Sequence, residues 1–60
     1  MDQLPNNPYM LVSAVNMLLR DGEFETLEDL CAYYGREPEE MKQMLKANGF
    51  AYNEEQKQFK

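Results

Sequence analysis

The sequence predicts a mainly α fold of three helices with a small β-hairpin at the C-terminus. Three segments carry apolar residues at helical spacing, and each is followed by a glycine that can end a helix. After the last of these glycines, aromatic residues instead alternate with polar ones, as they do in a strand. A chain of 60 residues has room for one domain only, which we take to span residues 1–60.

The first helix is expected at residues 8–20, after an N-terminal arm of residues 1–7. Asn7 has a side chain that suits the N-cap, and Pro8 suits the first helical position because it has no N–H to leave unpaired. Asp21-Gly22 then ends the helix.

The second helix is expected at residues 26–34, and the third at residues 38–48. Thr26 can cap the second helix, and Gly35 stops it. Pro38 opens the third helix after a tight turn. Both helices carry acidic residues in the first turn, where the helix dipole favours negative charge.

Residues 50–60 are predicted to form the hairpin, with a polar turn at residues 53–56. Its aromatic residues and Lys57 alternate with period two on either side of that turn. A short extended piece at residues 23–25 precedes the second helix and directs Phe24 inward. The order of helix, short strand, helix, tight turn, helix and hairpin is that of a winged helix-turn-helix, so we expect a winged helix-turn-helix-like domain.

The first helix carries more apolar surface than a domain this small can easily cover. Its apolar residues spread over an arc of roughly 220°, about twice the stripe that a surface helix needs. At one edge of this arc Met10 and Met17 flank Ala14, a combination typical of surfaces that pack closely or adaptably. We therefore expect Met10, Ala14 and Met17 to form the self-association surface of a homodimer. The alternative is a monomer in which the rest of the chain wraps a central first helix.

Ser13, Asn16 and Arg20 form a polar stripe on the opposite side of the same helix. Such a stripe is usually the solvated face. The sharper interpretation is structural: Asn16 or Arg20 caps carbonyl groups, or pairs with an acidic residue such as Asp21 or Glu23.

The composition argues against an enzyme and against a metal or other cofactor. The chain has no histidine and one cysteine, Cys31, so it can build neither a zinc cluster nor an internal disulfide. Neither Ser13 nor Cys31 has a basic neighbour in sequence to activate it, and we expect Cys31 in the core. No apolar run approaches the about 20 residues that span a membrane. We expect a cytoplasmic protein with no small-molecule substrate.

The formal net charge of −5 is unevenly placed. Residues 1–35 hold one basic residue against six acidic ones, whereas residues 36–60 hold five of each. If the domain read DNA, its contacts would be Lys42, Gln43, Lys46, Lys57 and Lys60. Affinity for DNA depends largely on neutralising phosphates with basic residues. A second half with no net charge and an acidic first half are poorly suited to this. We rank nucleic-acid binding below binding to another protein.

Two stretches of the chain share a pattern with a known family. The shared residues are Leu4 to Pro8, Met10 to Ser13, Val15-Asn16, Leu18 and Arg20-Asp21 in the first half, then Leu27 to Cys31, Gly49 to Gln56 and Gln58-Phe59. With them the chain resembles a short bacterial family catalogued only as a domain of unknown function. It differs at Lys57, where Asn is more usual. The resemblance implies a small stand-alone protein with no assigned activity, and it brings no site residues.

Overall fold

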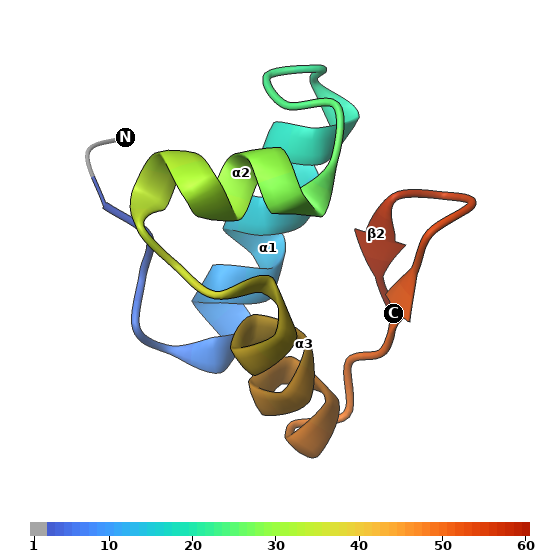
Figure 1. The fold of residues 1–60 in the computed structure, drawn as a ribbon. Helices are drawn as coiled ribbons and strands as arrows, with labels where there is room; N and C mark the ends of the chain where they lie inside the picture. Colours follow the sequence, from blue (N-terminus) through green and yellow to red (C-terminus); the bar gives the residue numbers. More distant parts are fainter. Residues whose placement is uncertain (1–2) are drawn as a thin grey trace.

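A computed structural model describes residues 3–60 and contains three helices and one two-stranded antiparallel hairpin (Figure 1). The elements are α1 (Pro8–Arg20), α2 (Leu27–Tyr34), α3 (Pro38–Ala47), β1 (Tyr52–Asn53) and β2 (Gln58–Phe59). The prediction of a mainly helical fold that ends in a hairpin is therefore confirmed. The first two residues of the predicted arm lie outside the described part of the chain.

The central element is α1, which contacts α2, α3 and β2. In Figure 1, α2 lies across α1, α3 packs at the lower end, and the hairpin lies on the side away from the N-terminal arm. The buried core residues come from every helix, from β2 and from the arm: Leu4, Leu11, Val12, Val15, Leu19, Leu27, Leu30, Cys31, Met41, Leu45 and Phe59. Burying each large aliphatic side chain stabilises the fold by about 1.5–3 kcal/mol.

The ends of the helices follow from local side chains. Asn7 accepts hydrogen bonds from the backbone N–H groups of Tyr9 and Met10, at 2.9 and 3.2 Å. Helix α2 begins one residue later than predicted because Thr26 lies outside it as the N-cap, where its hydroxyl accepts from Asp29 N at 3.1 Å. Helix α3 ends one residue earlier than predicted, with Asn48 as its C-cap.

The predicted extended piece at residues 23–25 forms no strand within the described chain. A strand needs a partner edge, whereas Glu23 N donates a hydrogen bond to Leu18 O, at 3.2 Å, near the end of α1. Phe24 nevertheless packs against the core, as expected of an inward residue.

The turn of the hairpin lies at residues 54–57, one position later than predicted. The side chain of Asn53 accepts a hydrogen bond from Gln56 N at 3.1 Å and so starts the turn from the last residue of β1. Lys57 therefore lies in the turn rather than in a strand, with a φ of 53°. The cross-strand partners are Tyr52 with Phe59 and Asn53 with Gln58.

Candidate interaction surface

One edge of the apolar arc of α1 is covered and the other is open. Val12, at the covered edge, is 6% exposed, whereas Met10 and Met17, at the other edge, are 62% and 42% exposed. Ala14 lies between these methionines and is only 6% exposed. The structure thus places two residues of the predicted self-association set on the surface and the third beneath them. We call Met10, Ala14 and Met17 the methionine flank.

A second apolar surface lies beside Met17, where the end of α1 meets α2. It is a hollow of about 500 Å³ lined by five apolar side chains and two carboxylates: Met17, Leu18, Phe24, Tyr33, Tyr34, Asp21 and Glu23. We call it the Tyr33 hollow, because Tyr33 is the most exposed large apolar residue of the described chain, at 71%. Sequence reasoning missed this residue, although adjacent tyrosines in a short helix cannot both face the core.

The polar stripe of α1 has a structural role at Asn16. Its side-chain Oδ1 accepts a hydrogen bond from Phe59 N at 2.7 Å, and its Nδ2 donates to Phe59 O at 3.1 Å. Arg20 Nε lies 3.7 Å from Asp21 Oδ1, and both side chains are largely in solvent. Ser13 is exposed. Asn16 therefore anchors the hairpin, Arg20 forms a surface ion pair, and the hydroxyl of Ser13 faces solvent.

The five residues considered for DNA contacts are not equally available. Lys42 Nζ lies 3.8 Å from Glu28 Oε2 and 3.9 Å from Glu39 Oε1, and it stands 5.5 Å from the centre of the Tyr52 ring. Its side chain is only 24% exposed, so the amine is engaged within the domain. The exposed members of the set are Gln43, Lys46, Lys57 and Lys60.

The hollow between α2 and the hairpin is acidic. Its lining includes the carboxylates of Glu25, Glu28 and Glu54, with Lys57 as the basic residue among them. Affinity for nucleic acid needs positive charge opposite the phosphates, and three carboxylates against one lysine do not supply it.

A comparison with known protein families shows which family this chain belongs to. The model of a family described as "Domain of unknown function (DUF4250)" matches residues 5–59. The chain belongs to the DUF4250 family. The resemblance to a family of unknown function is thereby confirmed over nearly the whole chain. No curated protein and no solved structure matches it.

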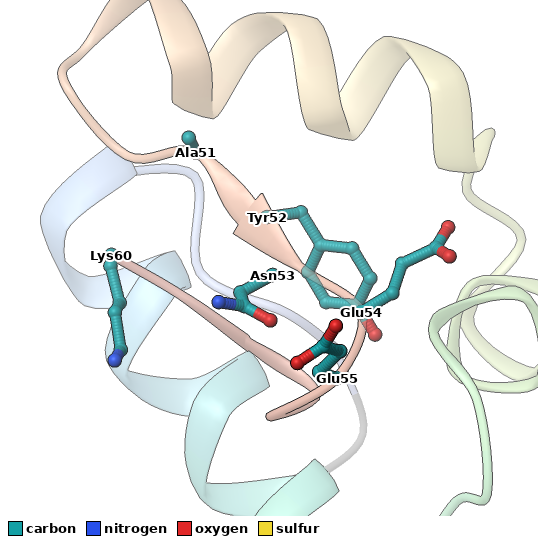
Figure 2. A pocket seen from close by; sticks show the side chains of 6 residues that line it. All are labelled: Ala51, Tyr52, Asn53, Glu54, Glu55 and Lys60. Carbon is teal, nitrogen blue, oxygen red and sulfur yellow. The ribbon is translucent and has the colours of Figure 1, made fainter.

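Another hollow of the DUF4250 chain lies along the hairpin and has a volume of about 580 Å³ (Figure 2). Its polar side chains do not converge on one point. Lys60 lies at the far side from Glu54 and Glu55 in Figure 2, and Asn53 already accepts the turn hydrogen bond from Gln56. A bound small molecule needs polar groups that point at it together, so this hollow has no constellation for one.

The cysteine of the DUF4250 chain is a core residue. Cys31 is fully buried, and its Sγ lies 3.8 Å from Met41 Sδ where α2 crosses α3. Burial raises the pKa of the thiol, with nearby Arg36 acting in the opposite direction. A reactive cysteine needs a lowered pKa and access to solvent, so the structure favours the core interpretation.

Residues 3–60 contain neither a metal-binding cluster nor a helix that could cross a membrane. No group of three or more His, Cys, Asp and Glu side chains in that range could hold a metal ion. None of the helices in it has the length and apolar character that crossing a membrane requires.

Proposed function

We propose that this DUF4250 protein is a non-enzymatic interaction module that binds a second copy of itself through the methionine flank. The observation that carries the proposal is the exposure of Met10 and Met17 on either side of a buried Ala14. Large apolar side chains that lie close together and are exposed to solvent indicate a surface that another polypeptide covers. We place the protein in the cytoplasm, where a free thiol such as Cys31 is the rule.

The order of side chains along the flank suits a two-fold symmetric pair. Met10 and Met17 are seven residues apart, or about two turns of helix, with Ser13 and Ala14 midway. In an antiparallel pair of α1 helices, Met10 of one copy faces Met17 of the other, and the small central residues let the helices approach closely. A two-fold interface needs this self-complementarity, in which residue i meets j and j meets i.

Charge also favours α1 as the meeting surface. The chain has eleven acidic residues, but none of them lies in α1, where Arg20 is the one charged residue. Two copies with a net charge of −5 each repel one another through most of their surfaces. The methionine flank lets them pack without placing carboxylates opposite each other.

Sedimentation equilibrium over a micromolar concentration series tests this proposal. We expect a dimer mass for the native chain and a monomer mass for Met10→Gln, which keeps helix propensity but removes the apolar end. Losing one methionine should weaken dimerisation by about tenfold or more. Tyr33→Ser is the matched control and should leave the dimer intact. A native monomer across the series, or a Met10→Gln chain that still dimerises, would refute the proposal.

We further propose that α2, the turn at Gly35 and α3 form a helix-turn-helix, with the hairpin in the position of a wing. Two observations support this: Gly35 adopts a left-handed φ of 69° that turns the chain sharply, and Cys31 contacts Met41 where the helices cross. The expected architecture is thus the basis of the second candidate function, DNA binding.

DNA binding is the weaker function because the basic residues are few and partly engaged. Lys42 lies between two carboxylates, and the hollow beside the hairpin is acidic. A gel-shift titration at low salt distinguishes the functions. Saturable micromolar binding that weakens with salt, and that Lys46→Gln reduces, would favour DNA over self-association. We expect no shift at these concentrations.

A further inference from the structure

The Tyr33 hollow has the features of a preformed apolar socket. Leu18, Phe24 and Tyr34 at its floor pack against the core, so the floor is anchored to the fold. The Tyr33 ring lies 5.5 Å from the Phe24 ring and 4.9 Å from the Tyr34 ring, although the side chain is mostly in solvent. An aromatic ring that already packs against neighbouring rings loses little conformational entropy when a partner binds. Such preorganised aromatic residues contribute strongly to affinity at interfaces.

The charge around the hollow defines what can cover it. Its lining holds two carboxylates, Asp21 and Glu23, and no basic residue. The next carboxylates along the chain, Glu25 and Glu28, line the separate hollow beside the hairpin. Of the two at the rim, Asp21 pairs with Arg20 at 3.7 Å, whereas Glu23 forms no ion pair with any residue between 3 and 60. An apolar socket with an acidic rim favours a partner that brings positive charge beside its apolar anchor.

The same charge excludes the other common occupants. Nucleic acids and anionic membranes carry the same sign as the rim carboxylates and are repelled. A second copy of this chain would bring its own rim carboxylates to the contact, unlike a contact through α1. A basic protein segment is the partner whose charge complements the two rim carboxylates.

We propose that the Tyr33 hollow docks a Lys- and Arg-rich amphipathic segment of another protein, which inserts a Leu or Phe side chain against Tyr33 and Phe24. The basic residues of that segment lie over Glu23 and Asp21 at the rim. Recognition of an amphipathic helix by a groove follows the same pattern of apolar anchors with charged flanks. This surface shares Met17 with the methionine flank, but Met10 and Ala14 do not line the hollow, so the two contacts are tested by different variants.

A pair of synthetic peptides tests the proposal. The probe is an amphipathic helix of leucine and lysine, and its counterpart carries glutamate at every lysine position. Titration into the isotopically labelled protein should give saturable NMR shift changes that cluster at Met17, Phe24 and Tyr33 for the lysine peptide alone. The binding should weaken several-fold when the salt concentration is raised, because the charged rim is exposed to solvent.

Three variants make the test specific. Tyr33→Ser should raise the Kd of the lysine peptide by about tenfold or more, as expected for an aromatic anchor. Tyr9→Ser is the matched control, since Tyr9 is also exposed and also packs one ring edge-on, against Phe50 at 5.7 Å. Met10→Gln should abolish the dimer and leave peptide binding unchanged, which separates this proposal from the previous one.

Several results would overturn the proposal: no saturable binding, equal binding of the two peptides, shift changes away from the hollow, or equal effects of Tyr33→Ser and Tyr9→Ser. Circular dichroism melts of each variant establish that the chain under test is folded. A folded Tyr33→Ser chain with unchanged Kd is sufficient by itself to reject the assignment.

Discussion

The side-chain amide of Asn16 pairs with β2 as a neighbouring strand would. Tyr52 and Phe59 face each other, and the hydrogen bond from Lys60 N to Ala51 O directs the N–H and C=O of Phe59 away from β1. Those two groups would be left without a strand partner, but Asn16 accepts from one and donates to the other. One side chain of α1 thus covers the outer edge of the sheet.

Replacing Asn16 by Ala should destabilise the domain by about 2–3 kcal/mol, because two hydrogen bonds are lost and two partly buried backbone groups remain unpaired. Urea unfolding at neutral pH measures the change. Ser13→Ala, on the exposed side of the same helix, is the control and should change the stability by less than about 0.5 kcal/mol. A loss for Asn16→Ala no larger than that of the control would show that the hairpin is held by packing alone.

Lys57 is the one residue other than glycine with a positive φ between residues 3 and 60. A left-handed backbone conformation destabilises the fold by about 1–2 kcal/mol for most L-residues. Glycine has no such strain, but it loses more conformational entropy on folding, which offsets part of the gain. Lys57→Gly should therefore stabilise the hairpin by about 0.5–1 kcal/mol. Thermal melts compare it with Gln56→Gly, which has no such strain to relieve and should be neutral or destabilising. Equal shifts in the two variants would rule out the strain.

The sequence anticipates part of the residue-scale picture and misses part of it. A structural role for Asn16 was one of two interpretations, but its partner Phe59 is 43 positions away and no local pattern connects them. Tyr33 was missed because the hollow around it is assembled from α1, the following loop and α2. Helical spacing places Tyr34 on the core face and leaves Tyr33 as an ordinary outward residue.

At the scale of elements, the three helix starts differ in how they are capped. Asn7 and Thr26 accept backbone hydrogen bonds at the starts of α1 and α2, whereas Glu37, at the start of α3, makes no side-chain cap bond. The backbone of Glu37 already has the extended conformation of an N-cap, with φ −91° and ψ 121°. A shorter acceptor at this position would satisfy an N–H group that is now without an intrahelical partner.

Glu37→Asp should consequently stabilise the domain by about 0.5–1 kcal/mol while leaving the net charge unchanged. Asn7→Ala is the complementary variant and should cost about 1 kcal/mol, since it removes the cap of α1. Both are measured by urea unfolding. If Glu37→Asp proves neutral while Asn7→Ala is destabilising, a side-chain cap stabilises α1 but has no effect at the start of α3.

The elements themselves were the most predictable part of the fold. Helix ends are determined by Pro, Gly and cap residues within a few positions, and those local signals placed all three helices to within one residue. The register of the hairpin turn depends on the Asn53 side chain, and the fate of residues 23–25 depends on whether a sheet edge is free. Both features depend on tertiary contacts rather than on local sequence signals. For this reason the predicted turn position and the predicted short strand are both wrong.

At the scale of the whole molecule, the buried Cys31 and the partly buried Tyr52 connect stability to alkaline pH. Burial raises the pKa of the Cys31 thiol above its usual 9.0. Burial also raises the pKa of Tyr52 above its usual 10.0, and the carboxylates of Glu28 and Glu54 act in the same direction. In both cases the folded protein holds a proton that the unfolded chain releases at lower pH.

This difference in proton binding predicts how the free energy of unfolding depends on pH. Well below the usual pKa of 9.0 for the thiol, both groups are protonated in either state, so their contribution to stability is complete. As the pH rises through the usual pKa values, the unfolded chain releases its protons first and the stability falls. Urea unfolding from pH 7 to pH 11 should show this decline in the native chain.

Cys31→Ala and Tyr52→Phe should each make the decline shallower, whatever they do to stability at pH 7, because each removes one of the two groups. The comparison is between slopes, so a packing defect in either variant shifts the whole curve without altering the test. Tyr52→Phe keeps the ring that packs against Phe59 at 4.8 Å between centroids and removes only the hydroxyl. If the double variant loses stability as steeply as the native chain, the alkaline transition arises from general charge repulsion in this acidic protein rather than from these two groups.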